Sequence, residues 1–137
     1  MIGLLILAQE QFGKGLLHSV EHVLGELPAQ LEAMPVDYLK MPEQIIQTMR
    51  PYIARLDQGQ GLLVLADVYG ASHTNAACRL LSEYHMELVS GVNLPMLIRV
   101  LTYRDLMLEE LIVKAVSGGI EGIVRAPHPL RAAEGGR

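Results

Sequence analysis

Continuous apolar runs alternate along this chain with stretches of helical spacing. Residues 2–7 read Ile-Gly-Leu-Leu-Ile-Leu, and residues 61–66 read Gly-Leu-Leu-Val-Leu-Ala. Because both runs are apolar at nearly every position, they are typical of strands buried on both faces, as in a parallel sheet. Shorter strands are expected at residues 31–36, 86–89 and 122–124.

The segments between these strands carry apolar side chains every three or four residues, which predicts amphipathic helices. Gly25 is expected to end the first helix and Pro42 to begin the second. Ser72 or Thr74 is expected to cap the third, and the pair Gly118-Gly119 to end the last. The helices are expected at residues 11–24, 42–56, 72–81, 95–103 and 107–116.

This alternation predicts an α/β fold, an open and mainly parallel sheet with helices on both faces. The length of 137 residues fits one domain, expected over residues 1–125. Residues 126–137, with two prolines and a glycine pair, are expected to form a mobile tail. In a flavodoxin-like strand order, ligands bind where the first and third strands end.

Composition narrows the class of protein. Half of the residues are apolar, 19% are charged and the net charge is −4. This indicates a globular domain and disfavours binding to nucleic acid or to an anionic membrane by bulk charge. The single Cys78 cannot form an internal disulfide and fits a cytoplasmic location. No apolar run reaches the ~18 residues of a membrane helix, so no membrane insertion is expected.

The loop after the third predicted strand is the main candidate for function. Asp67 stands at the end of the strand, and Ser72, Thr74 and Asn75 add polar donors at a helix start. Free backbone N–H groups at such a start attract phosphate or carboxylate groups. His73 is a candidate proton carrier or nucleophile. The structural interpretation of the same residues is a turn followed by a capped helix.

Two further motifs are weaker. A loop with Gly91 and Asn93 follows the fourth predicted strand, so we expect it at the same sheet edge. His18, Glu21 and His22 match the H-x-x-E-H spacing of a zinc site. A third ligand is wanting, so solvated histidines are the simpler interpretation, and no metal or cofactor is expected.

Three stretches resemble the mannose-family IIA component of the bacterial phosphoenolpyruvate-dependent sugar phosphotransferase system. They are residues 1–7, residues 65–77 around Asp67, and residues 91–97, which read Gly-Val-Asn-Leu-Pro-Met-Leu. The resemblance implies a flavodoxin-like sheet and a homodimer, in which a short antiparallel edge strand, here residues 122–124, is exchanged between subunits. It also implies a cytoplasmic phosphoryl carrier that takes a phosphoryl group from HPr, holds it on a histidine and passes it to a IIB component.

The chain departs from this family at the acceptor position. Ala8-Gln9-Glu10 stand where the family has a Thr-His-Gly-like motif, so Gln9 replaces the acceptor histidine. A glutamine amide cannot serve as the nitrogen nucleophile of a phosphohistidine relay. Asp67, which orients the histidine in the family, is retained. His73, where the family usually has proline, is either a relocated acceptor or a tolerated loop residue.

Three functions therefore remain open at the level of sequence. The first is a IIA component that carries phosphoryl groups in sugar uptake or its regulation. The second is a degenerate, non-phosphorylatable IIA homologue that acts as a binding or regulatory protein. The third is a small dimer that binds anions through helix N-termini alone.

Overall fold

The computed structural model describes residues 1–130, which form a four-stranded parallel sheet and five helices. The strands, in the spatial order β2-β1-β3-β4, are β1 (Gly3–Ala8), β2 (Leu31–Pro35), β3 (Leu62–Ala66) and β4 (Met86–Ser90). The helices are α1 (Glu10–Leu24), α2 (Pro42–Leu56), α3 (Ser72–Leu80), α4 (Leu94–Thr102) and α5 (Leu108–Glu121). The α/β fold predicted from the sequence is confirmed.

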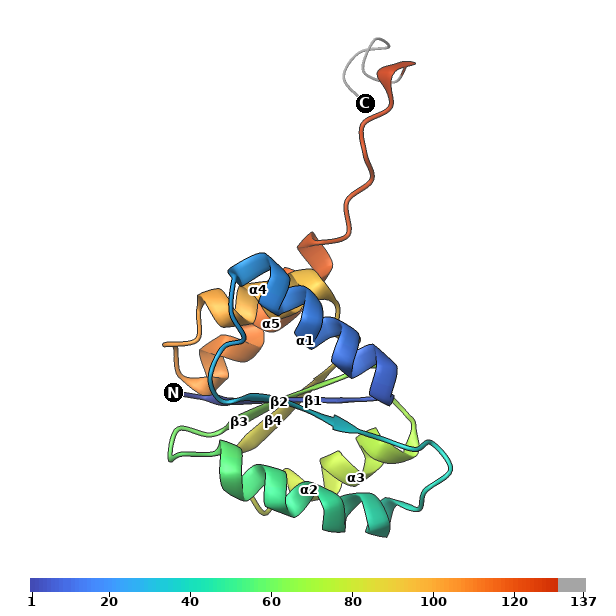
Figure 1. Ribbon diagram of the computed structural model, residues 1–137, viewed down its shortest axis with the longest axis vertical. Helices are drawn as coiled ribbons and strands as arrows, with labels where there is room; N and C mark the ends of the chain where they lie inside the picture. Colours follow the sequence, from blue (N-terminus) through green and yellow to red (C-terminus); the bar gives the residue numbers. More distant parts are fainter. Residues whose placement is uncertain (131–137) are drawn as a thin grey trace.

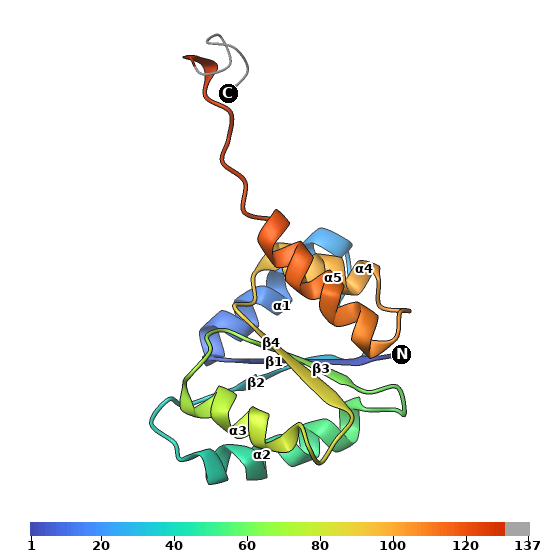
Figure 2. The same cartoon turned by 180° about the vertical axis from the view of Figure 1, so that it is seen from behind.

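The two central strands, β1 and β3, are buried along their whole length and pair in parallel from Gly3 opposite Leu62 to Leu7 opposite Ala66. Successive side chains point to opposite faces. Leu4 and its alternates pack under α1, α4 and α5, whereas the other set packs against α2 and α3. Figures 1 and 2 show these two helical layers on either side of the sheet. Continuous apolarity in these strands therefore reflects burial on both faces.

The predicted ends of α1 and α2 are confirmed, but the predicted cap of α3 is wrong. Gly25 follows α1 in the left-handed region at φ 88°, and Pro42 is the first residue of α2. The residue before α3 is Ala71, which provides no side-chain cap. The Thr74 hydroxyl accepts from the Gly70 N–H and donates to the Ala71 carbonyl, so it braces the preceding loop instead.

The glycine pair 118–119 does not end the last helix, because α5 continues to Glu121. A Cβ atom at Gly118 would lie 2.7 Å from the Cβ of Arg99, and one at Gly119 would lie 2.8 Å from the Cε of Met96. Both of these contacted residues belong to α4. The glycines therefore mark the close packing of two helices rather than a helix end.

Residues 122–124, expected as a short antiparallel edge strand, form no strand in the single chain. They begin a segment that leads away from the body of the molecule up to residue 130 (Figure 1). The remainder of the expected mobile tail, residues 131–137, lies outside the described residues. Within residues 1–130, none of the helices combines the length and apolarity needed to cross a membrane.

A buried arginine ties the amino ends of the sheet to the connection between α4 and α5. Arg104 donates from Nε to the Ile2 carbonyl at 2.9 Å and from its two other nitrogens to the carbonyls of Ala29 and Gln30. Burial lowers the pKa of Arg104 to about 10. Since its partners precede β1 and β2, Arg104 stabilises the amino ends of these strands, at the end of the sheet opposite to Asp67.

We expect alanine substitutions at two helical glycines to have opposite effects. Gly118→Ala should destabilise the fold by about 1–3 kcal/mol, because the new methyl group meets Arg99 at 2.7 Å. Gly15→Ala in α1 should stabilise it by about 0.5–1 kcal/mol, because nothing lies within 4 Å of a Cβ there. Urea unfolding of both variants checks this. Equal effects at the two positions would contradict the packing explanation.

Candidate functional site

The ends of β1 and β3 meet at the point where the strand order reverses. Asp67 follows β3, and the Gln9 backbone N–H donates to its Oδ2 at 3.3 Å. The chain continues from β1 to β2 on one side and from β3 to β4 on the other. This is the topological switch point at which open α/β sheets bind ligands.

Gln9 is occupied as the N-cap of α1. Its Oε1 accepts from the backbone N–H groups of Gln11 at 3.0 Å and Phe12 at 3.1 Å. A cap of this kind satisfies N–H groups that have no partner within the helix. The side chain of Gln9 is therefore turned back onto its own helix.

His73 lies at the start of α3 and pairs with Asp67. Its Nε2 lies 2.6 Å from Asp67 Oδ1, and the histidine is fully buried. Since an ionised carboxylate only accepts hydrogen bonds, the neutral imidazole here carries its hydrogen on Nε2 and its lone pair on Nδ1. Within residues 1–130, that Nδ1 atom is buried and has no hydrogen-bond partner. The fold thus builds an Asp–His pair from the end of β3 and the start of α3.

Asp67 collects hydrogen bonds from several segments. Besides His73 and Gln9, it accepts from the Val68 N–H at 2.8 Å and from the Tyr38 hydroxyl. Burial alone would raise the pKa of Asp67, but the hydrogen bonds from Tyr38, His73 and Val68 outweigh it and hold the pKa below its ordinary value. The hydrogen bond to Asp67 correspondingly raises the pKa of Tyr38. The carboxylate therefore stays ionised and the phenol stays protonated at neutral pH.

Tyr38 belongs to this candidate site but was not predicted from the sequence. It lies in the loop between β2 and α2, 29 residues before Asp67. Its ring also stacks on that of His73, with 5.2 Å between ring centroids and 23° between the planes. The sequence feature that could have identified Tyr38 is an aromatic residue with a hydroxyl group just after a parallel strand, because the carboxyl ends of parallel strands lie at one end of the sheet.

The other predicted site residues lie at this edge in different roles. Ser72 and Asn75 belong to the first turn of α3, where Ser72 is half-buried and Asn75 is exposed. Gly91 makes a left-handed turn at φ 80° after β4. Asn93 caps α4 through its Oδ1 and donates from Nδ2 to the Gly119 carbonyl. The side chain of Asn93 is thus engaged in joining α4 to α5.

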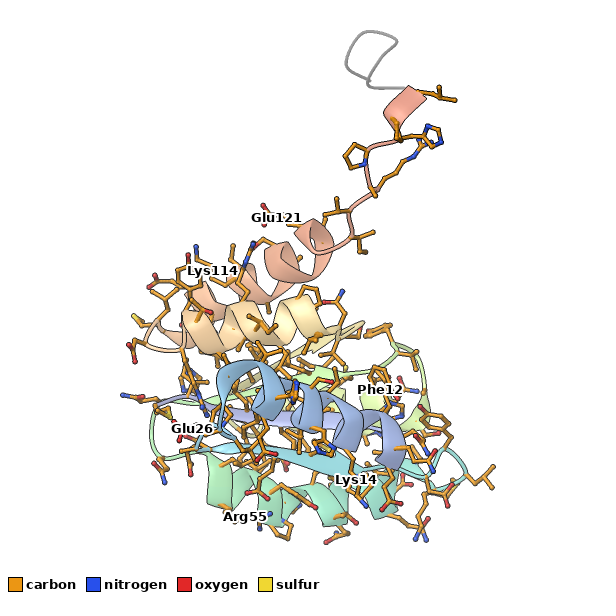
Figure 3. The ribbon with its side chains drawn as sticks, turned by 45° about the horizontal axis from the view of Figure 1, so that its top comes forward. Phe12, Lys14, Glu26, Arg55, Lys114 and Glu121 are labelled. Atoms are coloured by element: carbon orange, nitrogen blue, oxygen red, sulfur yellow. The ribbon has the colours of Figure 1, made fainter. Side chains whose placement is uncertain are left out.

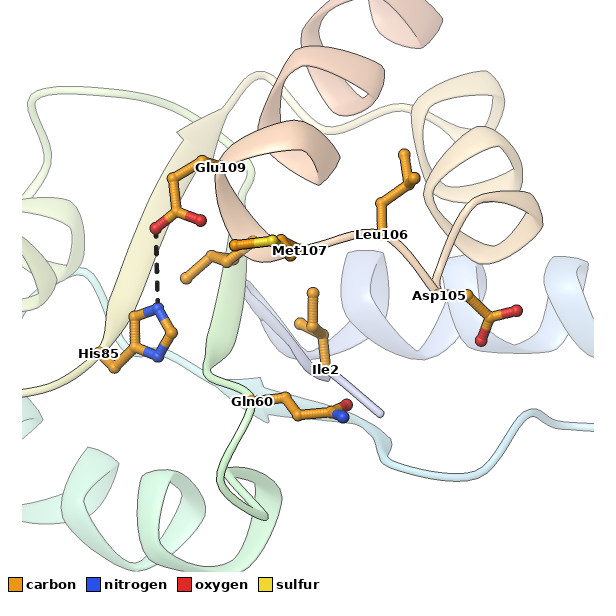
Figure 4. A pocket seen from close by; sticks show the side chains of 8 residues that line it. Ile2, Gln60, His85, Asp105, Leu106, Met107 and Glu109 are labelled. Carbon is orange, nitrogen blue, oxygen red and sulfur yellow. Dashed lines mark ion pairs between the residues drawn. The ribbon is translucent and has the colours of Figure 1, made fainter.

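A cavity lies at the amino ends of the strands, at the opposite end of the sheet from Asp67. His85 and Glu109 face each other across it, with 3.8 Å between Nε2 and Oε1 (Figure 4). His18 and His22 lie on α1. Nowhere in residues 1–130 do three or more His, Cys, Asp or Glu side chains gather as metal ligands would.

We expect Asp67→Asn to destabilise the fold by about 2 kcal/mol at pH 7, because charge-assisted hydrogen bonds are lost. The pKa of Asp67 in the folded state lies below its ordinary value of 3.8. The stabilisation by the charge is therefore complete above pH 3.8 and disappears as the pH falls through the folded-state pKa. The difference in free energy of unfolding between wild type and Asp67→Asn should therefore shrink in acid. Asp105→Asn, at an exposed position, is the control. A difference independent of pH would contradict the role of the charge.

Comparison with known proteins gives a consistent result. Residues 3–117 match the EIIA-man family, described as the PTS system fructose IIA component. The mannose-specific EIIAB component of Escherichia coli strain K12 is 36% identical over 113 residues, or 79% of this chain. The match covers 34% of that protein, so this chain spans about a third of its length.

Solved structures agree. The phosphotransferase component EIIA from Streptococcus agalactiae superposes with a TM-score of 0.81 at 25% identity, covering 91% of this chain and 97% of its own. The mannose/sorbose-specific IIA subunit from Enterococcus faecalis, at 21% identity, shares the fold with a TM-score of 0.78, covering 93% and 96% of the two chains. The chain therefore belongs to the EIIA-man family, whose members include IIA components of sugar phosphotransferase systems.

Proposed function

We propose that this chain meets HPr and a IIB component, in the cytoplasm, at the crevice between Gln9 and Asp67, and that it holds the phosphoryl group on His73. The observation that carries the proposal is the 2.6 Å contact between His73 Nε2 and Asp67 Oδ1. It provides an Asp–His pair at the switch point of a chain that has glutamine at the family acceptor position.

The chemistry follows from the assigned proton. With its hydrogen on Nε2, His73 has its Nδ1 lone pair available to attack phosphorus. A bond forms between Nδ1 and phosphorus while the bond between phosphorus and the HPr histidine breaks. The Nε2 hydrogen stays on its hydrogen bond to Asp67, whose charge stabilises the positive charge that develops on the ring. Transfer to IIB is the same exchange in reverse. Ser72 and Asn75, in the first turn of α3, are proposed to bind the phosphoryl oxygens.

An apolar rim around the crevice supports a protein partner. Its members are large exposed apolar side chains on the first turn of α1 and on the loops after β2 and β3, namely Phe12, Tyr38, Leu39, Met41, Val68 and Tyr69. Leu39 is 91% exposed, and Phe12 lies near the amino end of α1 (Figure 3). Large apolar side chains exposed on neighbouring segments are typical of protein interaction sites. This favours docking of HPr or IIB over binding of a free anion.

A second candidate function has a specific observation in its favour. His73 is buried, and Gln9 is used as a helix cap. Both features suit a IIA homologue that docks on its partners through the same rim without carrying phosphate. The two candidates differ only in whether the chain becomes labelled.

Incubation with phosphoenolpyruvate, enzyme I and HPr tests the proposal. Wild type should acquire one acid-labile phosphoryl group, and His73→Ala should lose it almost entirely, because the nucleophile is gone. His85→Ala, at the opposite edge of the sheet, should label normally. Labelling that survives His73→Ala would refute the acceptor assignment. An unlabelled wild type that binds HPr at micromolar concentration would favour the second candidate.

We also propose a homodimer in which residues 122–124 of one subunit pair with β4 of the other. β4 has β3 on one side, and on the other side no strand of the described part of the chain pairs with it. A groove beside it is lined by Glu87, Leu88, Val89, Ile112, Val113, Val116, Ser117 and Ile120. Ile123 and Val124 are more than three-quarters exposed in the single chain. Pairing would bury both the edge and these side chains, with the domain ending near residue 125 and the tail following.

The double substitution Ile123→Asp/Val124→Asp should convert a dimer into a monomer, because it places two charges in an apolar groove. Light scattering coupled to gel filtration measures the mass. Val23→Asp, at an exposed apolar position on α1, is the matched control and should leave the dimer intact. A monomeric wild type, or a dimer that tolerates the double substitution, would refute the exchange.

A further inference from the structure

One loop side chain contacts both members of the Asp67–His73 pair. Tyr38 donates its hydroxyl to Asp67 Oδ2 and stacks its ring on the imidazole of His73. Tyr38 itself is about half exposed, whereas His73 is fully buried. A half-exposed residue thus contributes to covering a buried one.

The acceptor sites of Asp67 are all taken. Oδ1 receives the His73 Nε2 proton and the Val68 N–H, and Oδ2 receives the Tyr38 hydroxyl and the Gln9 N–H. A carboxylate offers roughly four lone-pair sites. A new donor at this site must therefore displace an existing one. Of the two side-chain donors, only Tyr38 belongs to a residue with substantial exposure.

The loop around Tyr38 is well placed to respond to a partner. Leu39 and Met41 follow Tyr38 in the chain and are largely exposed, as part of the apolar rim defined above. A protein bound to that rim contacts the segment whose tyrosine covers His73. A small rotation of Tyr38 there would break its bond to Asp67 and separate the stacked rings.

We propose that Tyr38 is a positioning residue that controls access to the Asp67–His73 pair. With Tyr38 in place, the pair is closed and Nδ1 of His73 is shielded. With Tyr38 turned outward, one acceptor site on Oδ2 of Asp67 is vacant and Nδ1 is open to a phosphoryl donor. The functional consequence rests on the proposed role of His73 as acceptor, but the control of access does not.

Diethyl pyrocarbonate tests this without any phosphotransferase partner, because it acylates accessible, unprotonated imidazoles. Peptide mass spectrometry gives the rate at each histidine. In wild type, His73 should react at least about tenfold more slowly than the exposed His85, because reaction needs local opening. Tyr38→Ala should raise the His73 rate at least about tenfold by removing both the ring and the hydroxyl. Tyr38→Phe, which keeps the ring, should give a smaller rise.

Tyr69→Ala is the matched control, since Tyr69 is an exposed tyrosine on the same rim; it should leave the His73 rate unchanged. Circular dichroism verifies the fold of each variant. The proposal is overturned if His73 stays protected in folded Tyr38→Ala, or if wild-type His73 already reacts like His85. Should Tyr38→Ala fail to fold, Tyr38→Phe decides, and an unchanged rate there overturns the proposal.

Comparison with HPr-dependent labelling separates the two proposals. If Tyr38→Ala exposes His73 to the reagent but no variant is labelled by HPr, the acceptor role fails and the role of Tyr38 stands. If labelling depends on His73 while its reagent rate ignores Tyr38, the acceptor role stands and the role of Tyr38 fails.

Discussion

The parallel pairing of β1 with β3 is the constraint on which the rest of this structure depends. Both strands are buried along their whole length, so apolar helices must cover both faces of the sheet. α1, α4 and α5 cover one face, and α2 and α3 cover the other. The same pairing brings the residues after both strands together, which places Gln9 beside Asp67. The pairing of β1 with β3 therefore accounts for both the apolar core and the position of the candidate site.

The carboxylate of Asp67 organises the polar side of that junction. A partly buried charge is stable only when donors surround it, and here the donors come from four different segments: the end of β1, the loop after β2, the loop after β3, and α3. Gln9 caps α1 through its side chain, and Tyr38 stacks on His73, so the side chains around this carboxylate are engaged in local contacts.

The outer side of the sheet has a different character from its centre. β4 and α5 border an apolar groove beside an edge of β4 that has no strand partner within residues 1–130. The segment after α5 leads away from the body (Figure 2), and its Ile123 and Val124 are exposed. Native proteins usually blunt, charge or cover such an edge. Burial of apolar surface on association is the force that an exchanged strand would use.

The sequence by itself determined the strands and helices, the parallel sheet, and the position of Asp67 at a strand end, because continuous apolar runs and helical spacing are local signals. The expectation that Gly118-Gly119 end the last helix was wrong, because those glycines are required by close packing against α4, about 20 residues earlier in the chain. The sequence also assigned a strand to residues 122–124, which pair with no strand among the described residues of the single chain. Tertiary structure alone decided that His73 is buried on Asp67 and that Tyr38 covers the pair. Those contacts join side chains that become neighbours only when the carboxyl ends of parallel strands reach one edge of the sheet.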